Sequence, residues 1–472
     1  MKNKATKIFQ ILLILIIAIA IICAIYFKVT FPLSSFDSNL LTFKDGTSNA
    51  DSSVLIISIK RVAPYVILLF ILLYSVFCRF IKKYKKTYII SLSALSVIML
   101  LWSIGFFNYL YYATQKSNFI KENYVNPKGA NITFDKKRNL VFIMVESLET
   151  SLFTKEQGAY WNYEVIPELY NLIKDPDAVL FYNKEKDEQL NMIRGSSWTT
   201  ASIVANTSSL PLKVNFNDIF KDNYLSKAYT LGDILHDNGY DNEVISGSNT
   251  TFGHIGNYFK SHGDYRIIDK DTLNDYGLKM SKKDIGPWGF NDKYLFEIAK
   301  ERLNVLAKED KPFNLHLITI DTHFMDGFVS SYSTNKYKEQ YENSYATTSK
   351  LIYDFISWLK NQPYYKDTTI VIMGDHLCMQ SSFITKRKSR DRYVYNLIIN
   401  PSSKDAKTNN RIYTALDTLP TIISAVGGDI KGNKLGLGTN LFSNTSTLAE
   451  KYGINKLDNE LKKSSKYYNS LK

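Results

Sequence analysis

The sequence predicts a protein of two parts: N-terminal transmembrane helices, followed by an α/β domain with a mostly parallel, doubly wound sheet. Two observations lead to this fold class. Three long apolar runs lie within the first 113 of the 472 residues, and about twenty apolar residues cross the hydrocarbon core of a bilayer as a helix. From residue 140 onward, short apolar runs alternate with stretches of helical periodicity, which is typical of parallel strands joined by helices.

The first apolar run, Ile8–Phe27, contains no charged residue. A cleaved signal peptide is the alternative interpretation. The run is long for such a peptide, and no small-residue cleavage site follows it, so we expect a retained transmembrane helix. Val62–Cys78 and Tyr88–Tyr112 are the second and third expected spans.

Basic residues flank these runs. They precede the first run and separate the second from the third: Lys2, Lys4 and Lys7, then Arg79, Lys82, Lys83, Lys85 and Lys86. Because loops rich in lysine and arginine stay in the cytoplasm, the N-terminus and the second loop are expected inside. Three spans that start inside leave the rest of the chain outside the cytoplasm.

These features divide the chain into four segments. We expect a membrane domain with three transmembrane helices over residues 1–113, a polar linker over 114–139, an extracytoplasmic domain over 140–445 and a polar C-terminal tail over 446–472. Much of the formal charge of +13 lies beside the apolar runs, so we expect a membrane and not a nucleic acid as partner. Cys378 is the one cysteine of the globular part, which therefore cannot form an internal disulfide.

The globular part contains six expected strands and five expected helices. The strands are Leu140–Val145, Ala178–Tyr182, Glu243–Ser246, Phe313–Ile320, Thr368–Met373 and Tyr395–Ile399. The helices are Ile166–Ile173, Thr230–His236, Trp288–Leu306, Tyr341–Leu359 and Leu416–Val426. Leu140–Val145 is apolar throughout, as expected of a central strand buried on both faces.

Groups that bind metals or move protons follow three of these strands: Glu146, then Asp321-Thr322-His323, then Asp375-His376. The carboxyl ends of parallel strands share one edge of a sheet, where ligands bind. A carboxylate alone could be a helix N-cap, and a histidine alone is more often a surface or core residue. Their recurrence at three strand ends favours a site for a divalent ion such as Mn²⁺, Mg²⁺ or Zn²⁺.

The stretch Arg194–Ser202 supplies a candidate nucleophile. It is rich in Gly, Ser and Thr and runs into a helix, whose first N–H groups are a good seat for a phosphate. Thr199 could bind the metal and attack as an alkoxide, because coordination lowers the pKa of a hydroxyl. An ordinary Ser or Thr N-cap is the alternative.

Several motifs recur in the order known from one family. They are Glu146-Ser147-Leu148-Glu149, Gly195 with Trp198-Thr199, Asp321-Thr322-His323 with Asp326-Gly327-Phe328, Gly374-Asp375-His376, Leu416–Ile423 and Leu435–Gly438. In this order the chain resembles the phosphoglycerol transferase I family of the sulfatase and alkaline phosphatase superfamily. The resemblance covers residues 140–441 and implies a sulfatase-like catalytic domain.

A more distant likeness to lipoteichoic acid synthases implies the roles of single residues. By this resemblance one Mn²⁺-like ion, with Mg²⁺ or Zn²⁺ as alternatives, would be held by four residues: Glu146, Thr199, Asp375 and His376. Thr199 would be the nucleophile, and His323 would contact the substrate and act as acid and base. Asp326 is a further expected substrate contact. The synthases carry Trp and Arg where this chain has Thr251–Ile255, so His254 or Arg194 would take over recognition of the headgroup.

The implied function is a membrane-anchored phosphoglycerol transferase. It would move glycerophosphate from phosphatidylglycerol, through a phospho-threonine intermediate, to a hydroxyl of a cell-envelope glycan or glycolipid, and release diacylglycerol. The implied location is the bacterial inner (cytoplasmic) membrane, multi-pass, with the catalytic domain extracytoplasmic or periplasmic. The alternatives are a phosphoethanolamine transferase of the same superfamily and a catalytically inactive, membrane-tethered glycan-binding or scaffold protein. A sulfatase is disfavoured, because Ser196–Ala201 lacks the Cys/Ser-x-Pro-x-Arg pattern.

Overall fold

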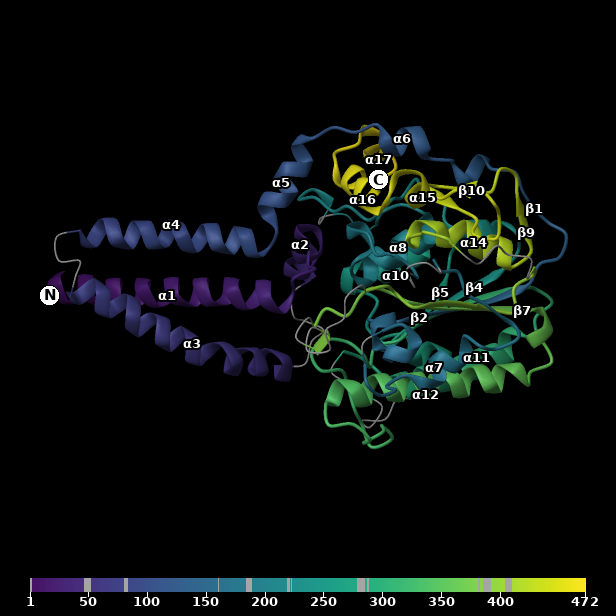
Figure 1. Cartoon of the computed structure of the whole chain (residues 1–472), viewed down its shortest axis with the longest axis horizontal. Coiled ribbons are helices and arrows are strands. Elements are labelled where there is room, and N and C mark those ends of the chain that lie inside the picture. Colours follow the sequence, from purple (N-terminus) through teal and green to yellow (C-terminus); the bar gives the residue numbers. More distant parts are fainter. Residues whose placement is uncertain are drawn as a thin grey trace.

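The computed structural model describes residues 2–45, 52–79, 84–159, 161–183, 189–218, 221, 223–277, 285–286, 288–380, 383–384, 392–403 and 410–472. Three long helices project side by side from one end of a layered α/β domain (Figure 1). The N-terminus lies at the end of the helices that is remote from this domain.

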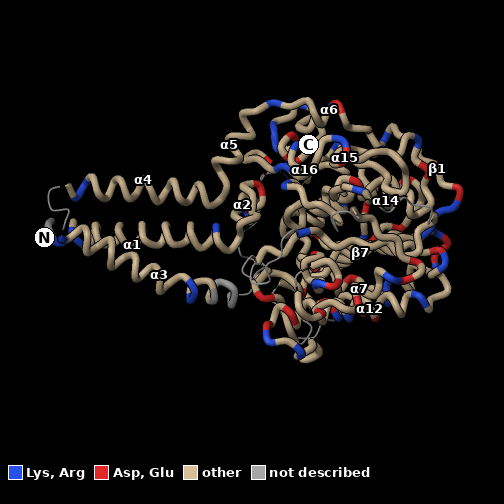
Figure 2. The backbone as a smooth tube through the Cα atoms, in the orientation of Figure 1, with Lys and Arg blue, Asp and Glu red and all other residues tan. Residues whose placement is uncertain are grey.

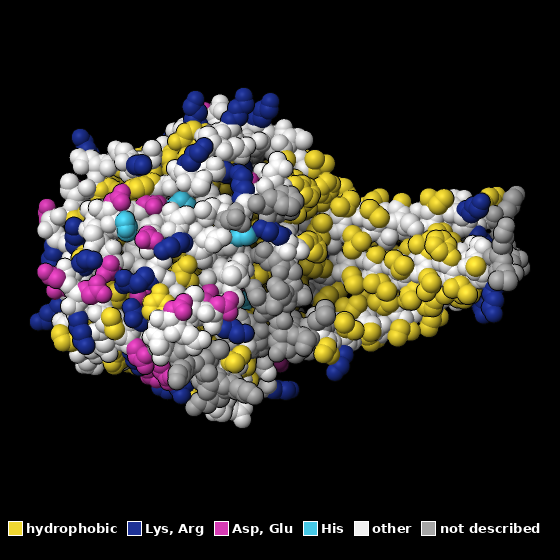
Figure 3. All heavy atoms as spheres, turned by 180° about the vertical axis from the view of Figure 1, so that it is seen from behind, with side chains coloured by type: hydrophobic (Ala, Val, Ile, Leu, Met, Phe, Trp, Pro, Cys, Tyr) yellow, Lys and Arg dark blue, Asp and Glu magenta, His cyan; other side chains and the backbone are white. Residues whose placement is uncertain are grey.

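The three projecting helices are α1 (Lys2–Thr30), α3 (Ser52–Arg79) and α4 (Lys85–Ser103). Each is long and apolar enough to cross a membrane, over Lys4–Thr30, Ser58–Arg79 and Lys85–Ser103. Lys and Arg stand toward the ends of the helices and leave their middle free of charge (Figure 2). Apolar side chains cover the outside of the bundle (Figure 3), as contact with lipid requires. Of the expected basic loop, Lys82 and Lys83 lie outside the described residues.

The third apolar run is shorter as a helix than its sequence suggested. In place of one helix to Tyr112, α4 ends at Ser103 and α5 (Phe106–Thr114) begins after Gly105. Gly105 has φ +81°, and a Cβ there would lie 3.3 Å from the backbone nitrogen of Phe36, at the start of α2 (Phe36–Asp45). The left-handed backbone breaks the helix and turns α5 out of the bundle direction.

A seven-stranded sheet forms the centre of the domain, in the order β3-β8-β7-β2-β6-β4-β5. Its strands are β2 (Asn139–Val145), β3 (Ala178–Val179), β4 (Asp241–Ser246), β5 (Arg266–Ile268), β6 (Phe313–Ile318), β7 (Thr368–Gly374) and β8 (Asn396–Ile399). β2 pairs in parallel with β6 and β7, and β4 is parallel to β5 and β6. Within this sheet β8 alone runs against the other strands, since it pairs antiparallel with both β7 and β3. The expected mostly parallel sheet is confirmed.

Helices cover both faces of this sheet (Figure 1). One face carries α7 (Pro167–Leu172), α11 (Asp292–Leu306) and α12 (Gln340–Lys360); the other carries α8 (Thr199–Ser208), α9 (Leu231–Asp237), α10 (Ile255–Ser261) and α14 (Thr418–Ala425). Along β2, Phe142 and Met144 belong to one apolar core and Ile143 and Val145 to the other. Alternate residues of a strand point to opposite faces, so this continuous apolar run serves two cores at once.

Two segments expected to be peripheral are folded onto the domain. In the expected linker, α6 (Phe119–Asn123) is followed by β1 (Ile132–Phe134), which pairs with β9 (Gly428–Ile430). A second small pair joins β10 (Lys434–Leu435) and β11 (Gly438–Thr439). The expected polar tail forms α15 (Leu448–Tyr452), α16 (Ile454–Lys462) and α17 (Lys466–Ser470). Leu457 and Leu461 of α16 are buried, because residues four apart lie on one helix face.

Candidate active site

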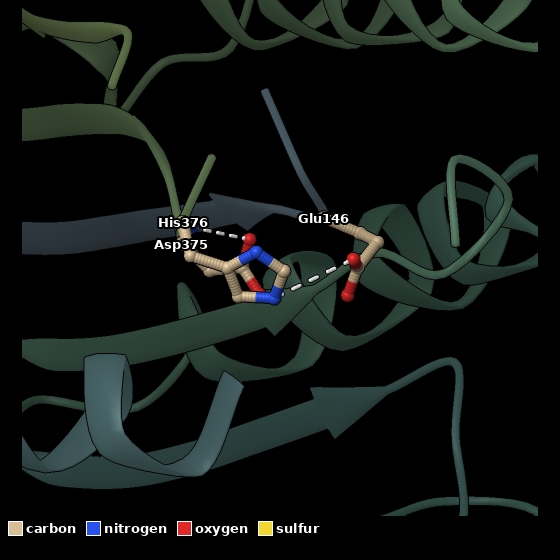
Figure 4. Close-up of side chains that lie close together, drawn as sticks. All are labelled: Glu146, Asp375 and His376. Atoms are coloured by element: carbon tan, nitrogen blue, oxygen red, sulfur yellow. Dashed lines mark hydrogen bonds and ion pairs between the residues drawn. The ribbon is translucent and has the colours of Figure 1, made fainter. Parts of the chain in front are cut away.

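Glu146, Asp375 and His376 meet at the carboxyl edge of the sheet. The register of β2 and β7 pairs Val145 with Gly374, so the residues that follow these two lie side by side. One ligand atom from each of the three lies within 4.8 Å of the others, and all three residues are buried. In Figure 4 the His376 imidazole lies beside the Asp375 carboxylate and faces the Glu146 carboxylate.

The Asp375 carboxylate has one satisfied and one unsatisfied oxygen. Its Oδ1 accepts the backbone N–H groups of Ser147 and His376, each at 2.7 Å. Its Oδ2 is buried without a hydrogen-bond partner among the described residues, 3.3 Å from His376 Nε2. A buried carboxylate oxygen without a partner destabilises the folded state. A cation bound at this point would supply the missing partner.

The His376 ring is oriented by the backbone. Its Nδ1 lies 2.9 Å from the Leu377 carbonyl, so we assign the proton to Nδ1, which leaves the Nε2 lone pair for a metal. Nε2 is 3.7 Å from Glu146 Oε1.

Thr199 completes the cluster. Its Oγ1 lies 3.4 Å from Glu146 Oε2 and 3.5 Å from His376 Nε2, while the Ser147 hydroxyl donates to Glu146 Oε1 at 2.6 Å. The structure thus brings together all four residues expected to bind the metal. Three oxygen groups and one imidazole suit a hard divalent cation, so the residues present fit such an ion.

Burial and charge act against each other in this cluster. Burial, together with the charge of Glu146, raises the pKa of Asp375 to about 7. Burial acts in the same sense on Glu146, but the charges of His323 and His376 outweigh it and lower the pKa of Glu146. Burial opposes the charged form of His376, and the two carboxylates overcome this and raise its pKa. A divalent cation satisfies both carboxylates without protonating either.

The start of α8 is open toward this cluster. Trp198, and not Thr199, is the N-cap residue of α8, and it makes no side-chain capping bond. The interpretation of Thr199 as an ordinary N-cap is therefore wrong. The Ser202 hydroxyl donates to the Asp375 carbonyl and ties the helix to the strand end. Backbone N–H groups at such a helix start bind phosphate oxygens.

The turn after His376 rests on a buried ion pair. Glu149 receives hydrogen bonds from Arg392 Nε at 3.0 Å and from the Cys378 backbone N–H at 2.8 Å. The sequence motif contained Glu149, but it did not show this supporting role, because Arg392 follows more than 240 residues later.

His323 lies at the same edge, after β6. Its Nδ1 is 2.7 Å from the Phe324 carbonyl, and its charge acts on Glu146. The ring of Trp288 lies beside it, with 4.4 Å between ring centroids. The sequence placed Trp288 in a helix, but α11 begins at Asp292 after the N-cap Asn291, which leaves Trp288 in a loop over His323.

The other expected substrate residues contact the membrane-proximal part of the chain. Asp326 pairs with Arg61 of α3, at 3.2 Å, and His254 Nε2 lies 2.6 Å from Lys44 Nζ of α2. Arg194 donates to the Ser34 carbonyl at 3.3 Å and is not part of the metal cluster. Lys44 and Arg61 were missed, since no sequence pattern links a membrane helix to these loops.

Comparison with known proteins identifies the family of this chain. The family model described as Sulfatase matches residues 138–428, more than half of the chain. The chain belongs to the sulfatase family. This family member nevertheless has Thr199 at the candidate nucleophile and lacks the Cys/Ser-x-Pro-x-Arg pattern there.

Relatives of this sulfatase-family chain include phosphoglycerol transferase I of Escherichia coli O6:K15:H31, which is 28% identical over 323 residues and 66% of this chain. The chain spans 40% of the length of that relative. Lipoteichoic acid synthase LtaP from Listeria monocytogenes has a similar fold, with a TM-score of 0.50 and 16% identity over 69% of this chain and 80% of that one. Lipooligosaccharide phosphoethanolamine transferase A from Neisseria meningitidis aligns over 88% of this chain and 84% of its own, with a TM-score of 0.52 and 15% identity.

Proposed function

We propose that this protein is a membrane-anchored, metal-dependent phosphoglycerol transferase. The observation that supports this most is the position of Thr199: its hydroxyl lies within 3.5 Å of Glu146 and His376, at the uncapped start of α8. The relationship to phosphoglycerol transferase I supports the glycerophosphate headgroup. A non-catalytic scaffold has no need for a hydroxyl, two buried carboxylates and an imidazole in this arrangement.

The proposed reaction has two displacements at phosphorus. Glu146, Thr199, Asp375 and His376 would hold one divalent cation, which we propose to be Mn²⁺, with Mg²⁺ or Zn²⁺ as alternatives; it would lower the pKa of the Thr199 hydroxyl and neutralise phosphate charge. Thr199 Oγ1 loses its proton to water and attacks the phosphorus of phosphatidylglycerol. The bond to the diacylglycerol oxygen breaks, and His323 gives that oxygen a proton.

In the second displacement, an acceptor hydroxyl gives its proton to His323 and attacks the glycerophosphoryl group on Thr199. The Thr199 oxygen leaves, and the N–H groups at the start of α8 bind the phosphate oxygens in both steps. The Trp288 ring lies beside that of His323, tilted by 52° to it, and would shield this proton transfer from water. Asp326 and His254 are the proposed contacts to the substrate headgroup.

The membrane helices fit the proposed donor and location. We propose that the protein is a multi-pass protein of the bacterial inner membrane, with the catalytic domain on the extracytoplasmic side. The partners are then phosphatidylglycerol, the membrane and a hydroxyl of an envelope glycan or glycolipid. Diacylglycerol stays in the bilayer after the first step.

The decisive experiment follows labelled phosphatidylglycerol with purified full-length protein, with and without Mn²⁺. We expect Thr199→Ala to slow diacylglycerol release by at least about 10³-fold. Thr200→Ala is the matched control, because the hydroxyl of Thr200 makes no hydrogen bond among the described residues. Equal release by Thr199→Ala and the unchanged protein would contradict the proposal.

Mass spectrometry of the trapped intermediate identifies the headgroup. A glycerophosphoryl adduct on Thr199 is expected, and a phosphoethanolamine adduct would indicate the alternative transferase.

A further inference from the structure

A cavity of about 140 Å³ lies between the membrane-proximal helices and the catalytic domain. We refer to it as the junction cavity. Asp37 of α2 and Asn108 and Tyr109 of α5 line one side, and Arg194 and Lys213 line the other. No member of the metal cluster lines it, nor does His323, so it is separate from the candidate active site.

Positive charge prevails in this cavity. Its lining includes four cations and two carboxylates: Arg194, Lys213, Lys462, Lys472, Asp37 and Asp458. Two of the four cations have carboxylate partners, because Lys462 pairs with Asp458 and Lys472 pairs with Asp218.

Arg194 and Lys213 have no ion pair among the described residues. The Arg194 guanidinium donates to the Ser34 carbonyl at 3.3 Å, and the Lys213 ammonium donates to the Lys463 carbonyl. Burial lowers the pKa of Lys213 to about 8, although the charge of Asp37 opposes this. The Lys213 ammonium also lies over the Tyr468 ring, at 5.2 Å from its centroid. The charge of Asp37 acts on both Lys213 and Arg194, so two cations share one carboxylate, and an anion placed beside them adds the missing negative charge.

The cavity lies where a bilayer presents its headgroups. α5 continues from the end of the span α4, and its Phe107, Leu110 and Tyr111 are 43%, 48% and 62% exposed. Aromatic side chains of this kind lie at the level of the headgroups. Basic pockets beside membrane helices bind anionic headgroups, and the side chains of Asn108 and Tyr109 offer hydrogen bonds to the ester and glycerol oxygens of a headgroup.

We propose that the junction cavity binds the phosphodiester headgroup of one anionic phospholipid through Arg194 and Lys213, as a site separate from the catalytic cluster. Only the membrane placement of α1, α3 and α4 is required for this proposal. It does not depend on the transfer reaction, and Arg194 is thereby assigned to this second lipid and not to the headgroup of the donor.

The test uses full-length Thr199→Ala protein, so that the proposed transfer reaction does not consume the lipid, in phosphatidylcholine nanodiscs titrated with phosphatidylglycerol. Native mass spectrometry counts the lipids that the released protein retains. We expect the combined Arg194→Gln and Lys213→Gln changes to remove one retained phosphatidylglycerol and to weaken its binding by about 30-fold. Lys213→Arg, which keeps the charge, is expected to retain the lipid.

Lys350→Gln serves as the matched control, since Lys350 is exposed and pairs with Asp354 on α12. A thermal unfolding transition equal to that of the Thr199→Ala parent verifies that the double variant is folded. Equal retention by the double variant and its Thr199→Ala parent would overturn the proposal. Retention of inorganic phosphate in place of the lipid would also overturn it. This experiment measures lipid binding, and the Thr199 experiment measures diacylglycerol release. A negative result for the junction cavity therefore does not bear on the proposed function, and a negative result for the proposed function does not bear on the junction cavity.

Discussion

At the scale of single residues, Ser147 links backbone geometry to the metal cluster. It has φ +54°, a conformation that favours glycine, and its hydroxyl donates to Glu146 at 2.6 Å. Ser147→Gly removes the hydroxyl and suits the backbone. We expect about tenfold weaker Mn²⁺ binding by calorimetry, because hydrogen bonds to ligating carboxylates tune affinity, with no loss of thermal stability. Unchanged affinity would contradict the role assigned to this hydroxyl.

His316 makes the stability of the folded protein depend on pH. It lies in β6 between Phe142 and Phe259, with centroid distances of 4.5 and 5.1 Å. Both ring nitrogens are buried without a hydrogen-bond partner among the described residues. Burial lowers its pKa from 6.5 to about 3. Below pH 6.5 the unfolded chain therefore binds a proton that the folded chain does not, and stability is lost as the pH falls toward 3.

His316→Phe removes this proton linkage. We expect the variant to be more stable by about 1 kcal/mol at neutral pH. The advantage should grow by about 1.4 kcal/mol for each pH unit below 6.5. Thermal unfolding at several pH values measures this. The control is His236→Phe at an exposed position, for which we expect a stability difference that does not change with pH. A stability difference for His316→Phe that stays constant below pH 6.5 would contradict the role assigned to His316.

The clustering of Glu146, Thr199, Asp375 and His376 could be predicted from the sequence, because these residues follow buried strands or start a helix. Glu146 and Asp375 come immediately after apolar runs, and a parallel sheet aligns such positions. Trp288, Arg61 and Lys44 could not be predicted in this way. Their contacts join segments that are far apart in the chain and carry no periodic signal.

At the scale of elements, the turn before α10 holds the His254 loop against α8. Gly253 has φ +60°, and a Cβ there would lie 2.4 Å from Thr200 Oγ1. Gly253→Ala would push the loop away from the start of α8, so we expect kcat to fall about 10- to 100-fold while Mn²⁺ affinity is retained. Gly277→Ala is the control, since Gly277 has φ +72° but no atom within 4 Å of a built Cβ. A similar loss in both variants would indicate backbone strain alone.

Elements with strong apolar patterns were predicted well, and short ones were not. The sequence located β2, β6 and β7 to within two residues at either end. β5 was missed because it has only three residues, two of them partly exposed. The break between α4 and α5 depends on the left-handed Gly105, and a hydropathy pattern contains no sign of it.

At the scale of the whole molecule, the basic residues at the remote end of the α1, α3 and α4 bundle predict that this end lies in the cytoplasm. In cells with Cys78→Ser, an impermeant thiol reagent should label Lys128→Cys, an exposed position of the domain. Lys86→Cys, at the remote end of the bundle, should be labelled only after permeabilisation. The native Cys378 is buried and should not react. Labelling of both engineered positions in intact cells would contradict the proposed topology.

The contacts of Asp326 with Arg61 and of His254 with Lys44 join loops near the candidate active site to the membrane-proximal part of the chain. In the proposed reaction, the lipid donor would then reach the site by lateral diffusion in the plane of the membrane. The rate of the first step would follow the surface fraction of phosphatidylglycerol in the bilayer and not its amount per volume of solution. Dilution of the membrane with a neutral lipid would slow the protein, whereas dilution of the whole suspension would not.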